Sequence, residues 1–551
     1  MEDSKLTKSN NPKTNYNLAV VTHCPSQQTA TIVMVEKPSV FSGIFKNFPI
    51  SNKDKQDKQA QKTLDDRTKF LIVFFVILIL FLCSVTGFFV MWFTDMYNNS
   101  IISDLVLTKN SEAFKWWTNP PLNPELRIHL FNYTNADRYM RGLDKKLKVE
   151  DLGPYTYIET FGKVNVTFNG NYTISYRENR TYTFSPEKSK GRQYDKITLP
   201  NIAFLTASAY LRNEGRMKQM GANLLITGPR AFKTLTAHEF IWGYKEPILE
   251  LKNSFKVGDS NIPNDDTFGM LRTRNGTSED VMTIFTGEDD LRKLSLIDRF
   301  NGQPKMNYWS TDECNQLDGT DGSQFPPHLM DKEQPLQVFI KAFCRKFPLV
   351  YEKEVNILNG IPAWRYKAPQ NVLAHPDNNS ANACYCDVTT NNCPPSGIFN
   401  ASLCFGAPIF SSFPHFYTGD PKLYENIEGL EPDEKKHLTY ADIHPRLAFP
   451  ISGASRFQMN IQVQKAYWLA GMAELKEGQY LPILWMEVTS GKLSEELRTM
   501  IYHSTFTANA IQLSLRYGSL LISATTMAML VAVCYYNDKN VQFLQKTQTT
   551  T

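Results

Sequence analysis

The sequence of 551 residues lacks the motifs that mark common enzyme active sites. It contains no G-x-S-x-G nucleophile turn, no glycine-rich phosphate-binding loop and no H-E-x-x-H zinc motif, because His238-Glu239 is followed by Phe240-Ile241-Trp242. The acidic pairs Asp289-Asp290 and Asp312-Glu313 are typical of surface turns. We therefore predict no catalytic residues, no cofactor and no metal site.

The sequence also has little net charge and no internal repeat. Its formal charge is +4, and residues 1–69 account for all of it with eleven basic and seven acidic side chains. The remainder is neutral and gives no indication of a nucleic-acid partner. The lack of a repeat of about 20–50 residues excludes a solenoid or a propeller. Thirty prolines instead favour an irregular, mixed domain.

The most prominent feature that is present is an apolar run, Phe70–Phe93. It reads FLIVFFVILILFLCSVTGFFVMWF, twenty-four residues without a charge. As a helix it would be about 36 Å long, enough to cross a hydrocarbon core of about 30 Å. Its two hydroxyl residues, Ser84 and Thr86, can bond back to the helix. A soluble helix would need a polar face, so we predict a transmembrane helix.

A second uncharged run, Tyr517–Tyr536, lies between Arg516 and Asp538. It is also long enough to span a bilayer, and its terminal tyrosines suit the membrane interface. Residues 94–516 contain no other uncharged apolar run of this length. The sequence thus predicts a largely disordered tail (1–69), a first span (70–93), an ectodomain (94–516), a second span (517–536) and a short C-terminal tail (537–551).

Charge and glycosylation motifs predict the same orientation. Six basic side chains lie between Lys53 and Lys69, whereas the first base after the span is Lys109, which places both tails in the cytosol. Eight Asn-x-Ser/Thr motifs lie between the spans, where glycosylation requires an extracellular or lumenal face. Their asparagines are Asn98, Asn132, Asn165, Asn171, Asn179, Asn275, Asn378 and Asn400.

The cysteines support an oxidising compartment for the ectodomain. Six of the nine lie within one window: Cys314, Cys344, Cys384, Cys386, Cys393 and Cys404. Zinc binding is the alternative, but the window lacks the paired Cys-x-x-Cys or Cys/His spacing that zinc requires. We predict three disulfides, for which spacing alone leaves fifteen pairings open.

The remaining cysteines lie outside the ectodomain. Cys534 lies near the cytosolic end of the second span and is predicted to be palmitoylated, with an unmodified thiol as the alternative. Cys83 lies in the middle of the first span and should not be acylated.

Two ectodomain segments allow local predictions. The alternation of Val164–Tyr176 predicts a hairpin with a three-residue loop that pairs Phe168 with Tyr172, Val166 with Ile174 and Val164 with Tyr176. Tyr182 and Phe184 would continue the alternation as a third strand. Residues 201–241 change to a helical period: Asn201 can cap one helix, which stops near Gly215, and Pro229 can begin another that carries Phe232, Leu235 and Phe240.

The helical region also carries a basic cluster opposed by a single acidic side chain, Glu214. This cluster consists of Arg212, Arg216, Lys218, Arg230 and Lys233. Such a group is either a solvated face or a surface for anionic ligands. From composition alone we favour the solvated face.

Several motifs resemble those of the class B scavenger receptor family, in order and spacing, from the first span to the second. They are Leu152-Gly153-Pro154-Tyr155, Trp242-Gly243-Tyr244-Lys245-Glu246-Pro247, Ile284-Phe285-Thr286-Gly287, Tyr308-Trp309, Gly319-Thr320-Asp321-Gly322, Phe325-Pro326-Pro327, Pro414-His415-Phe416 and Pro482-Ile483-Leu484-Trp485. Members include scavenger receptors, lysosomal integral membrane proteins, sensory neuron membrane proteins, croquemort and debris buster. The N-terminal tail is longer than is usual for the family.

The resemblance implies an α+β membrane protein. Two transmembrane helices would flank a large antiparallel β-barrel-like ectodomain with short helices, an apical helical bundle and an internal apolar tunnel. It also implies the disulfides Cys314–Cys384, Cys344–Cys404 and Cys386–Cys393. Phe405 occupies a position near the tunnel at which some relatives have a lysine.

The resemblance changes the interpretation of the basic cluster, because residues 201–241 correspond to the apex. We then expect a ligand surface there, with Arg230 and Lys233 as the principal contacts and Arg212, Arg216 and Lys218 beside them. If the segment after Pro229 is helical, Arg230 and Lys233 share one face of it.

The leading functional hypothesis is a receptor that binds lipid or lipoprotein ligands at its apex and transfers apolar cargo through the tunnel to the membrane. The expected partners are lipids, fatty acids, sterols or lipoproteins, and the expected location is the plasma membrane. The first alternative is a lysosomal or endosomal membrane protein that binds a luminal protein and exports lipid. Others are a phagocytic or adhesion receptor without transport and, least favoured, a membrane-tethered enzyme.

The predicted orientation can be tested by removing N-linked glycans. Enzymatic deglycosylation of the full chain should increase its gel mobility by several glycans, because all eight acceptor sites would face the glycosylation machinery. The single substitution Asn171→Gln should remove one step of that shift. A band that does not move after deglycosylation would contradict the orientation.

Overall fold

The structure is a computed structural model that describes residues 52–226, 231–246, 248, 267–357, 360–386 and 393–549. The chain divides into two compact units, residues 1–73 and 74–551, and each is described separately. The described part of the first unit is the beginning of helix α1 (Asn52–Phe93). All other elements belong to the second unit.

Among the described residues, two helical stretches are long and apolar enough to cross a membrane: Leu64–Phe93 and Glu495–Phe543. The first lies within α1 and contains the predicted span 70–93. The second contains the predicted span 517–536 and runs through α13 (Glu495–Tyr502), the π-helical turn η9 (His503–Thr507) and α14 (Ala508–Thr549).

Within the second unit, the two apolar helices pack through small and hydroxyl side chains. Ser523 Oγ donates to Ser84 Oγ at 3.0 Å, and a Cβ atom placed on Gly87 would lie 3.8 Å from the Cβ atom of Ser519. Small residues allow membrane helices to approach closely. Near the ectodomain, Arg516 Nε donates to a carbonyl of α1 at 2.8 Å.

In the described residues, the ectodomain is built around one sheet of fifteen strands, in which every strand pairing is antiparallel except that of β16 with β2. Its main path runs β10-β9-β3-β2-β1-β19-β18-β17-β13-β12-β11, and two small sheets pair β4 with β5 and β6 with β7. The strands are β1 (Leu122–Tyr133), β2 (Leu147–Phe168), β3 (Thr173–Phe184), β4 (Lys196–Pro200), β5 (Phe232–Thr236), β6 (Tyr244–Lys245), β7 (Thr267–Phe268), β8 (Gly276–Thr277), β9 (Met282–Phe285), β10 (Ile297–Phe300), β11 (Leu336–Ile340), β12 (Arg345–Ile357), β13 (Ile361–Lys367), β14 (Ile398–Asn400), β15 (Ile409–Ser412), β16 (Ile427–Glu428), β17 (Tyr440–Ile443), β18 (Pro450–Gln462) and β19 (Tyr480–Leu493).

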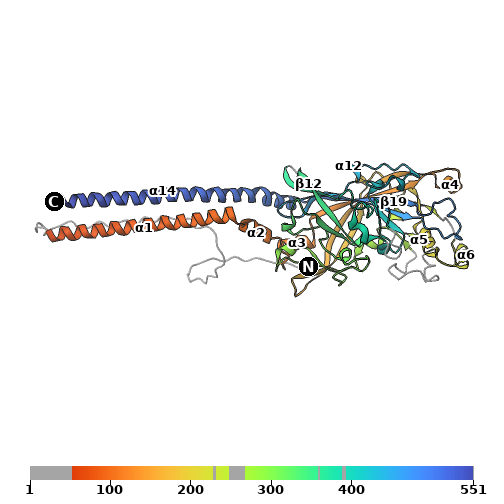
Figure 1. The fold of residues 1–551 in the computed structure, drawn as a ribbon, viewed down its shortest axis with the longest axis horizontal. Helices are drawn as coiled ribbons and strands as arrows, with labels where there is room; N and C mark the ends of the chain where they lie inside the picture. The colour runs from red at the N-terminus through yellow and green to blue at the C-terminus, as the bar shows by residue number, and fades with distance from the viewer. Residues whose placement is uncertain are drawn as a thin grey trace, which may run out of the picture. The chain divides into compact units, whose positions relative to one another are not determined.

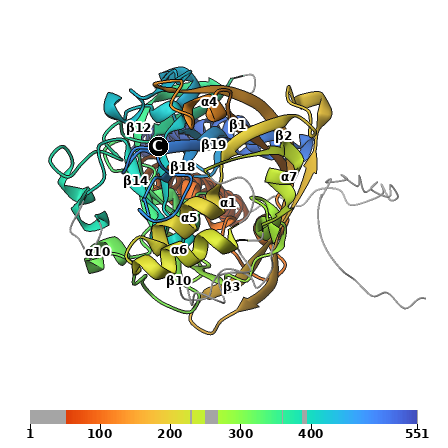
Figure 2. The same ribbon diagram turned by 90° about the vertical axis from the view of Figure 1, so that its right-hand side faces the viewer.

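Short helices surround this sheet. In the second unit, α5 and α6 lie at the end away from α14 (Figure 1), and Figure 2 looks onto that end. The α-helices are α2 (Met96–Ser103), α3 (Glu112–Thr118), α4 (Ala136–Tyr139), α5 (Ile202–Leu211), α6 (Arg216–Leu225), α7 (Ala237–Trp242), α10 (Asp312–Asn315), α11 (Ser402–Phe405) and α12 (Glu434–His437). Single 3₁₀ turns are η1 (Pro186–Lys188), η2 (Arg272–Arg274), η3 (Leu291–Lys293), η4 (Pro327–Leu329), η5 (Lys341–Phe343), η6 (Ser380–Tyr385), η7 (Pro414–Phe416) and η8 (Pro421–Leu423).

The edges of the main path are joined by a strap, Gly319-Thr320. Ile297 N of β10 donates to Gly319 O at 3.0 Å, while Thr320 exchanges hydrogen bonds of 3.1 and 2.8 Å with Gln337 and Phe339 of β11. Unpaired sheet edges expose backbone donors and acceptors, and barrels remove them by closure. The strap therefore closes the path of the sheet into a ring.

The helix predicted at Asn201 is confirmed. Asn201 Oδ1 accepts a hydrogen bond from Phe204 N at 3.2 Å, and α5 ends at Leu211, before Gly215. The helix predicted to begin at Pro229 is wrong in its described part, because Phe232–Thr236 forms strand β5 against β4. Its beginning lies outside the described residues.

The predicted hairpin register is also wrong. Phe168 pairs with Ile174 and Val164 with Arg177, and the register shifts between them. The loop is longer because Tyr172 takes a left-handed conformation (φ 56°) and Asn169 N donates to Thr173 O at 2.8 Å. No third strand follows, since Tyr182 and Phe184 end the continuous strand β3.

Three disulfides form in the second unit. Cys314–Cys384, Cys344–Cys404 and Cys386–Cys393 have Cα–Cα distances of 6.3, 6.1 and 4.6 Å. These are the pairs that the family resemblance implies, and they use all six ectodomain cysteines. Each is compatible with ordinary disulfide spacing.

The strap depends on glycine at position 319. Gly319 has φ 107°, and a Cβ atom there would lie 2.3 Å from Gln337 O. We expect Gly319→Ala to lower the free energy of unfolding by about 2–4 kcal/mol, because it adds a backbone clash to an unfavourable φ. Gly302→Ala is the matched control, since Gly302 also has a positive φ (78°) but no atom within 4 Å of the new Cβ.

The measurement is the thermal unfolding midpoint of the purified full chain. Gly302→Ala should cost only about 1 kcal/mol, the strain of the backbone conformation. Equal midpoints for the two variants would show that the strap does not hold the sheet.

Candidate functional site

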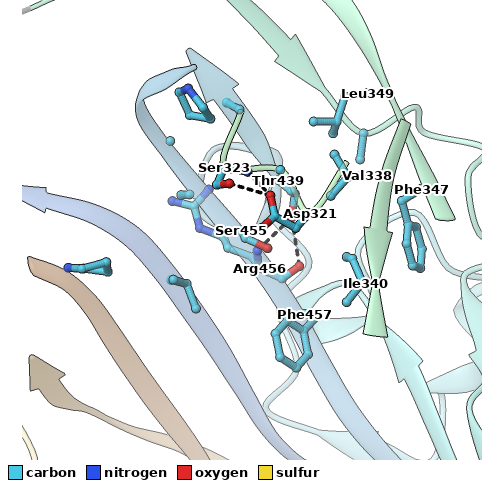
Figure 3. A pocket seen from close by; sticks show the side chains of 18 of the residues that line it. Asp321, Ser323, Val338, Ile340, Phe347, Leu349, Thr439, Ser455, Arg456 and Phe457 are labelled. Atoms are coloured by element: carbon cyan, nitrogen blue, oxygen red, sulfur yellow. Dashed lines mark hydrogen bonds between the residues drawn. The ribbon is translucent and has the colours of Figure 1, made fainter. Parts of the chain in front are cut away.

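Strands of the main sheet line a cavity of about 520 Å³. Figure 3 shows apolar side chains along one side of it: Val338 and Ile340 from β11, Phe347 and Leu349 from β12, and Phe457 from β18. Strand alternation brings Val338 and Ile340 to the same face, and likewise Phe347 and Leu349. A volume of this size lies within the range of about 300–1,000 Å³ that is usual for small-ligand sites.

A second set of lining residues is polar. Figure 3 shows Asp321, Ser323, Thr439, Ser455 and Arg456 together on the other side of the cavity. Asp321 Oδ1 accepts from Ser323 Oγ at 2.6 Å, and Thr439 Oγ1 donates to the Arg456 carbonyl at 2.9 Å. The cavity is therefore amphipathic, with its polar groups largely bonded to one another.

The guanidinium of Arg456 is fixed by a buried carboxylate. Arg456 Nε donates to Glu487 Oε2 at 2.6 Å, and Arg127 donates to the other oxygen of Glu487 at 2.8 Å. Arg127 in turn contacts Glu125, to which Lys188 also donates at 2.6 Å. This chain of alternating charges ties β1, β18 and β19 together behind the cavity wall.

Another charged group of the lining is centred on Glu178 of β3. Arg180 contacts Glu178 at 3.0 Å and also binds Glu159, and Lys341 contacts Glu178 at 2.8 Å. Burial alone would raise the pKa of Glu178, but the charges of Arg180 and Lys341 outweigh it and lower the pKa to about 2. Glu178 therefore remains ionised at physiological and lysosomal pH.

Lys163 of β2 is a buried lysine in the same lining. Its Nζ donates to Trp117 O at 3.0 Å and lies 4.7 and 5.5 Å from the ring centres of Trp117 and Tyr176. Burial lowers the pKa of Lys163, and the charges of Asp321 and Glu178 oppose that shift. The ring faces provide cation–π stabilisation in place of a direct ion pair.

The side chains of the basic cluster are less available for ligand contact than the sequence suggests. Arg212 pairs with Glu477 at 3.2 Å and Lys218 with Glu214 at 2.8 Å, while the Arg216 guanidinium lies 4.0 Å from the ring centre of Trp468. These three residues belong to α6 or to the turn that precedes it.

Lys233 is separate from these three residues. It lies on β5, where it pairs with Glu246 at 2.9 Å and its side chain is only 18% exposed. The ion pair with Glu246 therefore gives Lys233 a structural role. Arg230 lies outside the described residues.

Two of the family motifs contribute contacts, through His415 and Trp485, to one carboxylate, Asp151. It accepts from His129 (3.0 Å), His415 (3.2 Å) and Trp485 (3.0 Å), and the ring of Trp485 stacks on that of His129 at 3.8 Å. Partial burial by itself would raise the pKa of Asp151, but these hydrogen bonds outweigh it and lower the pKa well below its usual range. His437 stacks on His415 at 4.6 Å.

Comparison with known proteins shows the family of this chain. The sequence pattern of the CD36 family matches residues 74–535. The chain belongs to the CD36 family. Scavenger receptor class B member 1 of Bos taurus is 34% identical to it over 74% of this chain and 78% of that protein. Lysosome membrane protein 2 of Homo sapiens is 37% identical over 70% of this chain and 79% of that protein.

The family resemblance inferred from the motifs is thus confirmed, and the chain is a class B receptor with two membrane spans. Phe405, at the position where the resemblance implies a lysine in some relatives, is partly buried in α11 and packs against two core clusters. Within the described cavity lining, the charged side chains are instead Glu159, Lys163, Glu178, Arg180, Asp321, Lys341 and Arg456.

Sequence reasoning did not identify these lining residues. One signal was available, because Asp321 belongs to the motif Gly319-Thr320-Asp321-Gly322. A second was the alternation that places Lys163 on the same face of β2 as Phe161. The pairing of Arg456 with Glu487 has no local signal, since it depends on the register of β18 and β19.

The predicted modification sites of this CD36-family chain differ in exposure. None of the eight acceptor asparagines is buried, and Asn165, Asn171, Asn275 and Asn378 are exposed. Cys534 is exposed on α14. Glycosylation and palmitoylation at these positions remain predictions.

Two buried histidines predict a loss of stability in acid. Burial and the neighbouring His415 lower the pKa of His437 to about 3, and burial and Arg446 lower that of His444 to about 4. His444 Nδ1 accepts from Arg446 N and Leu447 N, both at 3.1 Å, so a proton there would break these bonds. The folded chain therefore binds these protons less readily than the unfolded chain.

Stability should be intact above pH 6.5 and decline below it. For each histidine, the free energy of unfolding should fall by about 1.4 kcal/mol per pH unit until its folded pKa is reached. The total loss at pH 5 is then about 2 kcal/mol for each histidine. Unfolding midpoints at pH 7.4, 6.0 and 5.0 would measure this. His437→Gln with His444→Gln should flatten the profile, whereas His503→Gln, which removes an exposed histidine, is the control. Parallel profiles for the double variant and the parent would contradict the prediction.

Proposed function

We propose that this receptor binds lipid or lipoprotein ligands at the end of the ectodomain that carries α5 and α6 and passes apolar lipid through the ectodomain cavity to the membrane. The observation that carries the proposal is the cavity of about 520 Å³ within the ectodomain sheet. Aromatic and aliphatic side chains from β11, β12 and β18 line it.

The energetics of the lining suit an apolar occupant. Burying each CH₂ group of an acyl chain or sterol contributes about 0.8 kcal/mol. The lining residues Arg180 and Lys341 are balanced by Glu159 and Glu178, and Arg456 pairs with Glu487. An apolar cargo therefore leaves most of the lining charges paired, which limits the cost of removing water from them.

The relatives support two locations. One is the plasma membrane, with both tails in the cytosol and residues 94–516 outside the cell. The second candidate is a lysosomal or endosomal membrane protein that binds a luminal partner and exports lipid. The 37% identity to Lysosome membrane protein 2 favours this alternative. Microscopy of the full chain at steady state separates the two.

The role of the cavity can be tested by filling it. Ile340→Trp adds bulk to a side chain that lines the cavity (Figure 3), and Ile340→Leu keeps its volume as the matched control. Cells displaying equal amounts of each form should bind lipoprotein equally, but lipid transfer should fall about tenfold with Ile340→Trp, a change of about 1.4 kcal/mol. The measurements are bound particle protein and internalised labelled lipid.

Equal lipid transfer by the two variants would show that lipid does not pass through this cavity. Equal transfer would favour capture without an internal route, as in a phagocytic or adhesion receptor. Overpacking costs about 1–3 kcal/mol of stability, so surface amounts of each variant are measured first.

A further inference from the structure

Arg345, the first residue of β12, is a buried cation. It is only 4% exposed, although arginine is almost never fully buried unless it is paired. Its Nη2 donates to two neutral acceptors, Val372 O at 3.3 Å and Asn382 Oδ1 at 2.9 Å. No carboxylate of the described residues forms an ion pair with it. The charge of Arg345 is therefore not balanced by any part of the chain that the structure describes.

Aromatic rings surround the guanidinium of Arg345. Its central carbon lies 3.9, 4.7 and 4.9 Å from the ring centres of Tyr385, Phe347 and Phe399. These rings attract the cation but carry no net charge. Burial raises the pKa of the Tyr385 hydroxyl, so Tyr385 stays neutral, and burial lowers the pKa of Arg345 only to about 10. The guanidinium is thus protonated at physiological pH and below.

A small pocket lies beside this guanidinium. Its volume is about 20 Å³, and its polar lining side chains are those of Arg345, Asn382 and Tyr385. The other described lining residues are apolar, apart from the disulfide-bonded Cys386. The Nε–H of Arg345 is buried and donates to no described atom. The site therefore combines an unused cationic donor, which is unfavourable when buried, with room for one particle of about the size of water.

We propose that this pocket binds a halide ion, which is chloride under physiological conditions, and that the ion accepts a hydrogen bond from Arg345 Nε. The volume admits a single-atom anion but not a carboxylate, phosphate or sulfate group. A water molecule would satisfy the N–H group but would leave the buried charge unbalanced, and an unbalanced buried charge is the larger cost. Chloride is abundant both outside cells and in the lumen of endosomes.

The halide site would support the wall of the larger cavity. Leu373 lines both the small pocket and the larger cavity, and Phe347 lines the larger cavity while it contacts the Arg345 guanidinium. Two disulfides adjoin the site, because Cys386 lines the pocket and Cys344 directly precedes Arg345. An ion there would hold the disulfide region against β12. This inference is independent of the proposed transfer of lipid.

The first test compares anions. The purified full chain is unfolded thermally in sodium chloride, sodium bromide and sodium gluconate at equal ionic strength. Chloride and bromide should raise the unfolding midpoint above its value in gluconate, by about 2 °C when the halide concentration is about ten times its Kd, and the effect should saturate. Equal midpoints in the three salts would overturn the proposal and would favour a water molecule in the pocket.

Substitution of the arginine distinguishes a specific site from a general salt effect. Arg345→Met removes the cation, so the difference between chloride and gluconate should disappear. Arg365→Met is the matched control, because Arg365 lies on the neighbouring strand β13 and pairs with Asp442 at 2.7 Å. This variant should be less stable but should keep the chloride response of the parent. An equal chloride response in the parent and Arg345→Met would contradict the proposal.

Bromide also locates the site without any substitution. In crystals of the full chain grown with bromide in place of chloride, anomalous scattering should show an ion within hydrogen-bond distance of Arg345 Nε. Bromide bound only elsewhere would overturn the proposal.

A carboxylate of the chain is the remaining alternative. Asp387 follows Cys386 in the sequence and lies outside the described residues. If the parent showed no halide response and Asp387→Asn lowered the midpoint as much as Arg345→Met in every salt, Asp387 would supply the counter-charge and the proposal would be wrong. A halide response that Asp387→Asn leaves unchanged would support the ion.

Discussion

The hydrogen bonds of Gly319-Thr320 to β10 and β11 are the constraint on which the ectodomain depends. They join the two edges of the sheet path, and strands of this sheet line the cavity. The same turn places Asp321 on the cavity wall immediately after the strap. Closure and one polar group of the cavity thus come from three consecutive residues, and the close approach to Gln337 explains why glycine occupies position 319.

Charged side chains can line the cavity because most of them are paired. Glu178 and Glu487 each contact two cations, and Lys163 lies between aromatic rings and a backbone carbonyl. Breaking one partner of such a buried set typically costs about 3–5 kcal/mol. The Asp151 group extends the same principle to two family motifs that are distant in sequence, because they supply His415 and Trp485.

The features that were predicted from the sequence are those that a short stretch of residues determines. The two spans, the cap at Asn201 and the family follow from runs, caps and motifs that a short window contains. The hairpin register failed because Tyr172 adopts a left-handed conformation that alternation does not reveal. Lys233 was misplaced because strand pairing with β4 and the ion pair with Glu246 overrode its helical pattern. The cavity was not predictable residue by residue, since its lining depends on which strands become neighbours.

The apolar side chains of α6 show a further limit of predicting burial from helical periodicity. Met217, Met220 and Leu224 have the spacing of a core-facing helix, yet they face outward while Gln219 is buried and bonds the Trp468 backbone. A period of 3.6 residues identifies the apolar face of a helix but not what covers it.

The cavity meets a physical requirement of the proposed route. An acyl chain of sixteen carbons that crossed open water would lose about 12 kcal/mol of favourable burial, at about 0.8 kcal/mol per CH₂. In the proposed route, a cavity walled by Val338, Phe347 and Phe457 would reduce that loss, because apolar side chains would replace water around part of the chain.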